Sequence, residues 1–340
     1  MKKDYIIRQA NSKDIDRIMG FIKEHWSSNH ILANCKEFFE YEYRYDDTVN
    51  YVIAENVISS DIGSVLGFIT YGKTNSDIML ALWKSKEKKD PFLGVEVLNY
   101  LLKKEDTRIV ACCGINNKTI GIYEYLGFYT GKLEHFYRLS EKKDYTIAKI
   151  SDSYRIPVKE KEYQFVLLKD FHELEKVFDF TAYKNSNPKP YKEPWYIKKR
   201  YFNHLVYNYE VYGIKNKSER IESIIFTRTI EVQNKRVLRI VDFIGNIQDL
   251  NFISYEVEQL LKTCNFEYVD FYQFGISKEI MKNAGFLLKS DTKNIIPNYF
   301  EPFVQENMDI YYFTTDSEGF TIFKGDGDQD RPNFYRSKMI

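Results

Sequence analysis

The stretch that most constrains the fold is residues 108–139, in which two apolar runs flank a compact helical pattern. Residues 108–114 have the length and composition of a buried strand, and residues 128–139 form a second run rich in aromatic side chains. Between the two runs, Asn116 can cap a short helix, and Gly127 stands where a glycine commonly ends one. The pattern therefore predicts a strand, a short helix that lies on a sheet, and a further strand.

The same order of elements is expected twice along the chain. The hydrophobic pattern of the first half predicts elements at residues 5–9, 11–26, 36–45, 50–55, 65–71 and 77–83, then a helix that ends near residue 102. The second half predicts them at residues 164–168, 170–183, 193–206, 209–214, 221–232, 236–245, 250–264, 268–274 and 277–283. A repeat of this length predicts two fused domains of one fold, residues 1–145 and residues 146–340.

The helical stretch of the first half carries a family resemblance. Asn116, Thr119, Ile122-Tyr123 and Gly127-Phe128 resemble the N-x-x-A-x-x-L-Y-x-x-x-G-F signature of the GNAT acyl-CoA N-acyltransferases. The resemblance implies an α/β fold of two tandem GNAT-like domains, each with a mixed sheet whose fourth and fifth strands splay apart. In the first domain that opening is expected to hold acyl-CoA. The second domain is expected to shape the acceptor site or to be inert, and the opposite assignment of the two domains is left open.

The resemblance also places the pyrophosphate of acetyl-CoA after the strand predicted at residues 77–83. Backbone N–H groups at a helix start, aided by the helix dipole, can hold a diphosphate. Lys89 takes the basic position of the family's R/Q-x-x-G-x-G/A motif and Gly94 its final glycine, while Phe92 stands where the middle glycine is usual. A solvated basic loop is the alternative. The expected cofactor-binding residues are Leu82, Trp83, Lys88, Lys89, Phe92, Leu93, Gly94, Val95 and Asn116.

In the reaction that the resemblance implies, an amine attacks the thioester carbonyl directly. Tyr123 falls where the family often has a tyrosine that protonates the departing CoA thiolate, although a core aromatic on an amphipathic helix is the plainer interpretation. Asp77 and Glu55 are the candidate general bases. A strand N–H near Leu82 or Trp83 is expected to polarise the carbonyl, and alignment of the two substrates is expected to matter most.

Two features of the second half are candidates for binding the acceptor. Trp195 and Arg200 lie on one predicted helix among aromatic residues, which suits a sugar ring or a nucleotide diphosphate as well as ordinary packing. Near the end of the chain, Asp326, Asp328 and Asp330 alternate and Arg331 follows. The spacing resembles the start of a calcium loop, but Arg331 replaces the required glycine and no glutamate follows, so no metal is expected. Carboxylates that bind an acceptor amine are the functional interpretation, and a solvated turn is the simplest one.

The acidic ending also looks like that of tandem GNAT proteins from bacterial surface-polysaccharide gene clusters. We therefore expect transfer of an acetyl group to a primary amine, with an amino sugar or nucleotide-linked amino sugar as the preferred acceptor. An aminoacyl transferase that uses aminoacyl-tRNA, and a non-catalytic GNAT-like ligand-binding module, are the alternatives.

Composition limits the partners. The chain has 49 basic and 49 acidic residues, so no net field favours nucleic acid or an anionic membrane. Its four cysteines have neither metal-site spacing nor the pattern of a disulfide framework. No apolar run approaches the roughly 20 residues of a membrane span, and no signal peptide is recognised. The expectation is a cytoplasmic protein with a small-molecule amine acceptor and no nucleic-acid or membrane partner, and the sequence leaves its oligomeric state open.

Overall fold

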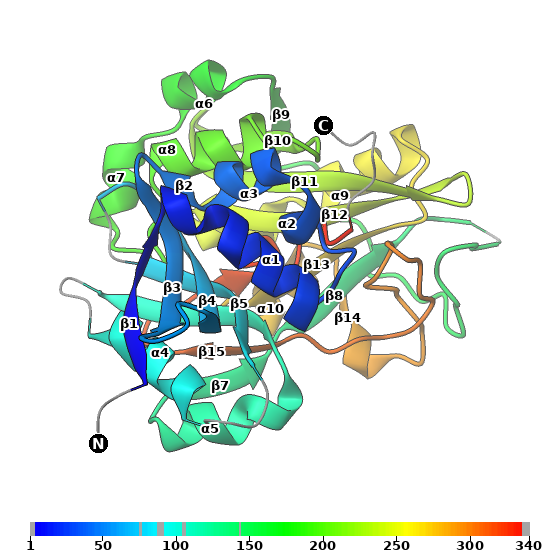
Figure 1. Cartoon of the computed structure of the whole chain (residues 1–340). Coiled ribbons are helices and arrows are strands. Elements are labelled where there is room, and N and C mark those ends of the chain that lie inside the picture. The colour runs from blue at the N-terminus through cyan, green and yellow to red at the C-terminus, as the bar shows by residue number, and fades with distance from the viewer. Residues whose placement is uncertain (1–3, 75–76, 87–91, 104–106, 143, 335–340) are drawn as a thin grey trace.

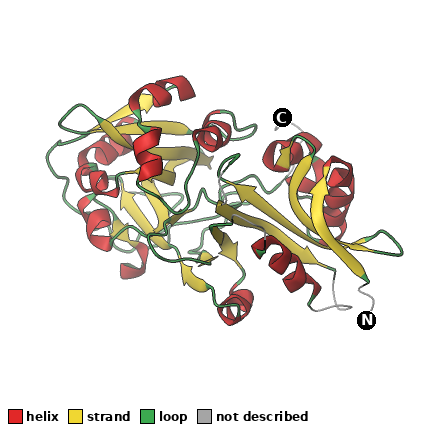
Figure 2. Ribbon diagram, turned by 90° about the vertical axis from the view of Figure 1, so that its left-hand side faces the viewer, coloured by secondary structure: helices red, strands yellow, loops and turns green. Residues whose placement is uncertain are grey.

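The computed structural model describes residues 4–74, 77–86, 92–103, 107–142 and 144–334, and its strands form two eight-stranded mixed sheets (Figure 1). In Figure 2 the strands fall into two groups, each accompanied by helices. The first sheet has the order β1-β3-β4-β5-β6-β15-β7, with β2 paired to β3, and the second has the order β14-β8-β13-β12-β11-β10-β9, with β16 paired to β13. Both sheets contain one parallel pair, β5 with β6 and β12 with β13.

The strands of the first sheet are β1 (Tyr5–Asn11), β2 (Arg44–Tyr45), β3 (Thr48–Asn56), β4 (Ile62–Thr70), β5 (Asp77–Ser85), β6 (Ile109–Ile115), β7 (Tyr129–Lys132) and β15 (Tyr311–Thr314). Those of the second sheet are β8 (Glu134–Leu139), β9 (Gln164–Leu168), β10 (Glu210–Lys215), β11 (Ile221–Val232), β12 (Lys235–Gly245), β13 (Tyr268–Phe274), β14 (Leu287–Leu288) and β16 (Ile322–Phe323).

The helices of the first half are η1 (Ser12–Asp14), α1 (Ile15–His25), α2 (Ile31–Asn34), α3 (Lys36–Tyr43), α4 (Leu93–Leu102), η2 (Asn117–Thr119) and α5 (Ile120–Tyr125). Those of the second half are α6 (Phe171–Val177), α7 (Phe180–Asn185), α8 (Pro194–Ile197), the π-helical η3 (Lys198–Phe202), η4 (Ile247–Phe252), α9 (Ser254–Thr263), α10 (Lys278–Asn283) and η5 (Lys289–Asp291). None of the helices in the described part of the chain combines the length and the apolarity that crossing a membrane requires.

Local chemistry sets the helix ends that the sequence predicts. The Asn116 side chain accepts from the backbone N–H of Lys118 at 2.9 Å and caps η2, and Gly127 ends the following helix at a φ of +82°. In the second half Ser277 caps α10, and Gly285 follows it at a φ of +89°. The two helix–glycine stretches are thus built alike, because only a residue without a Cβ enters the left-handed region without strain.

The alternation of β5 places helices on both faces of the first sheet. Ile78 and Leu80 pack with α4 in one apolar cluster, whereas Met79 belongs with α1 and α3 to another on the opposite face. That second cluster also contains Tyr196 and Phe226 from the second half. The two halves therefore share a continuous core, which fixes the position of any site between them.

Three predicted elements were wrong in detail. Residues 128–139 form two strands instead of one, since β7 pairs with β15 in the first sheet and β8 pairs with β13 in the second. The helix expected at residues 170–183 is interrupted, because Asp179 caps a new helix, and the helix expected at residues 193–206 ends as η3.

Strand β15 lies between β6 and β7 in the first sheet, and β8 lies between β14 and β13 in the second. Each sheet therefore contains a strand from the other half of the sequence. The domain boundary between residues 145 and 146 stays a prediction.

Candidate functional site

The site is organised by the point where β5 and β6 part. Their parallel pairing runs from Asp77 opposite Ile109 to Leu80 opposite Cys112, and no further pair forms although β5 continues to Ser85 and β6 to Ile115. We call the space between residues 81–85 and residues 113–115 the first gap. Strands β5 and β6 correspond to the fourth and fifth strands of the predicted order. Their expected parting is thus present in the first sheet.

A bulge in β5 coincides with this parting. Leu66 of β4 is opposite Trp83 and Phe68 is opposite Leu80, so two residues of β5 face the single residue Gly67. A bulge disrupts the ladder locally and bends the strand that contains it. The bulged residues are Ala81 and Leu82, and the expected carbonyl-polarising N–H groups of Leu82 and Trp83 therefore lie where β5 leaves its neighbour.

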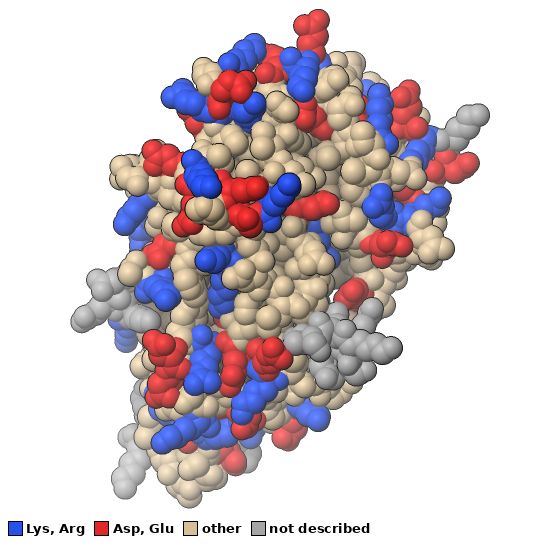
Figure 3. All heavy atoms as spheres, turned by 90° about the horizontal axis from the view of Figure 1, so that it is seen from above, with Lys and Arg blue, Asp and Glu red and all other residues tan. Residues whose placement is uncertain are grey.

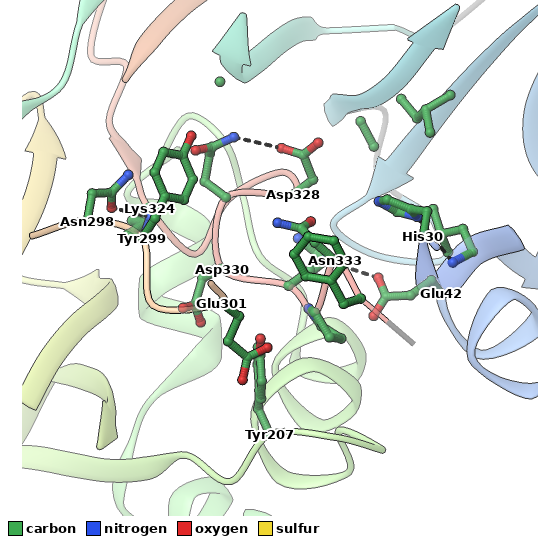
Figure 4. A pocket seen from close by; sticks show the side chains of 18 of the residues that line it. His30, Glu42, Tyr207, Asn298, Tyr299, Glu301, Lys324, Asp328, Asp330 and Asn333 are labelled. Carbon is green, nitrogen blue, oxygen red and sulfur yellow. Dashed lines mark hydrogen bonds and ion pairs between the residues drawn. The ribbon is translucent and has the colours of Figure 1, made fainter. Parts of the chain in front are cut away.

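The first gap opens into a cavity of about 1050 Å³ that both halves of the chain line (Figure 4). The first half contributes residues 80–83 of β5, Cys112 and residues 114–116 from β6 and its end, Thr119, Tyr123, and residues of α2, α3 and the connection between α1 and α2. The second half contributes Tyr207, residues 228–231 and 298–301, and the segment at 328–334. Such a volume is typical of a small-molecule site, and its lining mixes apolar strand residues with many polar and charged side chains.

The segment at residues 322–334, called the tail below, is held between the two sheets. Asp326 is fully buried, where its carboxylate accepts from the Tyr71 hydroxyl at 2.8 Å and pairs with Lys192 at 2.9 Å. Asp330 pairs with Arg228 at 2.6 Å, and Arg331 donates to Glu42 at 2.7 Å. The simplest interpretation of the acidic ending, a solvated turn, is therefore wrong, because ion pairs and backbone hydrogen bonds hold the tail inside the protein.

Charges in the cavity wall are mostly neutralised by partners. Burial alone would raise the pKa of Asp330, but Arg228 and Arg200 outweigh it and hold that pKa below its usual value. Burial likewise opposes the ionisation of Glu42, yet Arg331 and its other cationic neighbours lower the Glu42 pKa to about 2. Burial, followed by the charge of Arg239, lowers the pKa of Lys324 to about 7.

Several of the predicted cofactor residues lie at this cavity. Leu82, Trp83 and Asn116 line it, as does Tyr123, whose ring stacks on Phe313 at a centroid distance of 4.2 Å. Burial raises the pKa of Tyr123 above its usual value, so the phenol is protonated at neutral pH.

Other predicted cofactor residues belong to the start of α4. Leu93 is buried in the core, Gly94 lies against Trp83 and Ser85, and Phe92 is exposed at the helix start, one residue before Leu93. Val95 follows in the first turn of α4 and is half-buried. Lys88 and Lys89 lie outside the described residues.

The two candidate bases do not belong to the described wall of the cavity. Asp77 lies at the closed end of the β5–β6 pair, where the Arg108 guanidinium donates to it at 2.7 Å and the Tyr191 N–H at 2.6 Å. Glu55 is the penultimate residue of β3 and pairs with Arg8 at 2.8 Å and Arg17 at 2.9 Å. Both carboxylates hold other segments in place, and their catalytic role stays a prediction.

The predicted acceptor residues divide in the same way. Asp328, Asp330 and Arg331 line the cavity, but Asp326 is buried behind it. Arg200 donates to the backbone carbonyl of Asp330 at 2.7 Å and so supports the tail from outside.

Trp195 is the predicted acceptor residue that packs elsewhere. Its ring lies against Tyr45 at 5.2 Å and beneath the Lys199 ammonium at 5.2 Å. It is not among the described residues that line the cavity.

Sequence reasoning missed the side chains that loops and distant helices bring to the cavity. Asn298, Tyr299 and Tyr207 come from segments without a strand or helix period, and His30 and Glu42 come from α2's cap and α3 (Figure 4). No local signal distinguishes these residues, because only the shared core of the two halves brings them together.

The second sheet parts in the same manner but its opening is occupied. The parallel pairing of β12 and β13 ends at Ile240 opposite Phe271, and we call the space between residues 241–245 and residues 272–274 the second gap. Strand β16 pairs with β13 at Gln273 and Phe274. Because β8 still pairs with the other edge of β13 at Gln273, β16 lies where β12 has left.

Comparison with known proteins bears on the fold. A GCN5-related N-acetyltransferase from Anabaena variabilis is similar over 91% of this chain and 72% of its own, with a TM-score of 0.53 and 9% identity. A conserved protein of unknown function from Enterococcus faecalis V583, described as a probable N-acyltransferase, is similar over 91% and 71%, with a TM-score of 0.54 and 8% identity. No protein-family model matches the sequence, and no curated protein is similar enough to count as a relative.

These similarities, with the two mixed sheets and their parting strands, confirm the expected fold class. The chain is an α/β protein of two tandem GNAT-like domains. At such low identity the comparisons establish the fold alone.

Proposed function

We propose that this protein is an N-acyltransferase that moves an acyl group, preferably acetyl, from acyl-CoA to a primary amine. The observation that carries the proposal is the parting of β5 and β6 at the mouth of the cavity. Two structurally similar proteins are described as N-acetyl- or N-acyltransferases, which supports the same class of reaction.

The residues at the first gap fit the elongated arm of an acyl-CoA. Strand edges that stop pairing present backbone N–H and C=O groups, and these groups are costly to leave unsatisfied when buried. The β5 and β6 edges would hold the pantetheine amides, and the first turn of α4 would face the diphosphate. When bound, the thioester supplies an activated acyl group.

Within this assignment the chain aligns the reactants and stabilises charge. The bulged part of β5 directs backbone N–H groups of Leu82 or Trp83 toward the carbonyl oxygen. Tyr123, protonated at neutral pH, would donate a proton to the departing thiolate. The walls of the cavity hold the amine near the carbonyl, and proximity of this kind contributes several kcal/mol to a bimolecular transfer.

The remainder of the cavity supports an oxygen-rich acceptor such as an amino sugar or a nucleotide-linked amino sugar. Asn298 Nδ2 and Arg331 Nη1 are buried donors without a hydrogen-bond partner in the described part of the chain, and both residues line the cavity. Hydroxyl or phosphate oxygens would satisfy these donors. Tyr207 and Tyr299 add aromatic surface on which a ring could lie.

Binding and turnover test the proposal together. Acetyl-CoA at 100 times its dissociation constant should stabilise the protein by about 2.7 kcal/mol, seen as a higher melting temperature, and CoA thiol should be released when a primary amine such as D-glucosamine is added.

The Ala81→Phe variant, which fills the first gap, should abolish the shift in melting temperature. Ala182→Phe, at an exposed position of α7, should keep it. No stabilisation of the unmodified protein by acetyl-CoA would contradict the proposal. Salt-sensitive tRNA binding would instead favour an aminoacyl transferase.

A further inference from the structure

Asp328 stands where the first gap closes. Gly327, on one side of it, has a φ of +65°, and a Cβ there would lie 3.3 Å from Met79 Cγ and 3.5 Å from Cys113 Cβ. Gln329, on the other side, lies against Gly114, where a Cβ would be 2.0 Å from its Nε2. The neighbours of Asp328 thus touch β5 and β6 on either side of their last pair, Leu80 opposite Cys112.

The surroundings of Asp328 differ from those of the other tail carboxylates. Asp326 and Asp330 each pair with a cation, whereas no Lys or Arg nitrogen of the described residues lies within 4.0 Å of the Asp328 carboxylate. Its hydrogen-bond partner is the Gln329 side chain, which donates to it at 3.1 Å. The side chain is only partly buried and lines the cavity (Figure 4). Asp328 is therefore a carboxylate still available to an incoming cation.

The chemistry of acyl transfer requires such a group. A primary amine attacks a carbonyl only as its free base, and at neutral pH most of an alkylamine or amino-sugar amine is protonated. The amine must lose one proton before attack and another afterwards. A carboxylate beside the carbonyl carbon can attract the ammonium and take its proton.

We propose that Asp328 is the catalytic base of this protein, delivered by the tail to the first gap, so that the acyl-CoA half depends on the far end of the chain. The inference rests on the function proposed above. The amine nitrogen forms the C–N bond to the thioester carbonyl, the C–S bond breaks, and the sulfur leaves with the bonding electrons. The amine proton passes to the Asp328 carboxylate, and the thiolate takes a proton from Tyr123 or from water.

Two other carboxylates that line the cavity are neutralised by cations, which supports the same assignment. Arg228 and Arg200 neutralise Asp330, and Arg331 neutralises Glu42. Burial instead raises the pKa of Asp328 above its usual value, with Gln329 and Arg331 opposing it only in part. A carboxylate with a raised pKa is a better proton acceptor at neutral pH than an ordinary aspartate.

An affinity label tests the position without knowledge of the acceptor. In Asp328→Cys, the new thiolate should displace bromide from bromoacetyl-CoA and form a thioether, detected as a mass increase on the peptide that contains residue 328. The matched control is Ser317→Cys, on the exposed loop after β15, and the unmodified protein gives the background of its own cysteines. We expect residue 328 to be labelled at least tenfold faster than residue 317, and excess acetyl-CoA to block labelling at residue 328 but not at residue 317.

Activity then tests the role. With D-glucosamine as the probe amine, Asp328→Asn should lower kcat about 100-fold or more while leaving the KM for acetyl-CoA unchanged, and Asp328→Glu should restore part of the rate. Acetyl-CoA that stabilises the protein but does not protect residue 328, or an unchanged kcat in Asp328→Asn, would overturn the inference and leave the proposed function standing. Absence of acetyl-CoA binding would overturn both.

Discussion

The two gaps of the molecule begin alike and end differently. In each sheet the pairing of two parallel strands stops before the strands end. The last paired residues are Leu80 with Cys112 in the first sheet and Ile240 with Phe271 in the second. In each, the preceding antiparallel pair contains a bulge just beyond that last pair. The first gap opens into the cavity, but the second holds the chain's own tail, where the Gly325 N–H donates to the Val241 carbonyl at 2.6 Å.

The difference shows how one architecture can be open or occupied. Two residues beyond the last pair, the first gap has Leu82 and the second has Asp242, which shares the Lys192 ammonium with Asp326 of the tail. A ligand entering the second gap would have to displace a backbone hydrogen bond and a buried ion pair. The tail thus fills one gap and then continues to line the cavity of the other.

Removing the ion pairs that hold the tail in the second gap should have the largest effect on the free energy of unfolding. Lys192→Met leaves the buried carboxylates of Asp242 and Asp326 without their shared cation and should lower the free energy of unfolding by about 3–5 kcal/mol. Lys36→Met, which removes an exposed pair with Asp16, should change it by less than about 1 kcal/mol. Urea unfolding of both variants measures the contrast, and equal losses would show that the tail is not anchored by this pair.

In the open cavity, the stabilising ionisation of Glu42 should be lost in acid. The pKa of Glu42 is about 2 in the folded protein, below the usual value of about 4.3, so its ionisation contributes stability above pH ~4.3 that is lost as the pH falls toward 2. The shift corresponds to about 3 kcal/mol. Glu42→Gln should remove this contribution, so its free energy of unfolding should approach that of the unmodified protein between pH 4 and pH 2.

The control for Glu42 is Glu37→Gln, at an exposed position of the same helix, which should change the free energy of unfolding by less than about 0.5 kcal/mol at every pH. A pH-independent difference for Glu42→Gln would mean that its carboxylate is not held ionised by Arg331.

Tyr123 distinguishes the two halves at the chemical step, because Met281, which has no phenol, occupies the corresponding place in the second half. If the phenol donates a proton, Tyr123→Phe should lower kcat for CoA release about 100-fold, or about 2.7 kcal/mol of transition-state stabilisation, with little change in KM. The phenyl ring keeps the stacking on Phe313, so the melting temperature should hardly move. An undiminished kcat would assign the phenol to packing.

The smallest effect concerns the backbone contact that fills the second gap. A Cβ at Gly325 would lie 2.6 Å from the Val241 carbonyl oxygen, so Gly325→Ala should cost about 2 kcal/mol. Gly20→Ala, in α1 with nothing within 4 Å, should stabilise by about 0.4–1 kcal/mol instead. Thermal unfolding gives both signs, and a neutral Gly325→Ala would mean that the tail sits loosely in the gap.

The sequence predicts those parts of the molecule that local chemistry determines. Asn116 and Gly127 set the ends of one helix, and apolar periods place most strands of both halves within a few residues of their true bounds. The break at Leu133 was missed because β7 and β8 are divided by pairing with distant strands, and Gly131 alone is a weak local signal for it.

The site was predicted only where local sequence determines it. Leu82 and Trp83 follow from the order of strands, and the acidic tail was recognised by its composition. That the tail is buried, and that Asp328 reaches the first gap, depends on contacts across more than 200 residues of sequence, such as Tyr71 with Asp326. Surface charge offered little guidance, since Lys and Arg are interspersed with Asp and Glu over the face in Figure 3.

Hydrogen–deuterium exchange with and without acetyl-CoA tests the central contrast most directly. If the first gap takes the acyl-CoA and the tail closes the second, added acetyl-CoA should slow exchange at residues 80–83 and 113–116 and leave residues 241–245 and 272–274 unchanged. Slower exchange at the second gap, or no change at the first, would contradict this account.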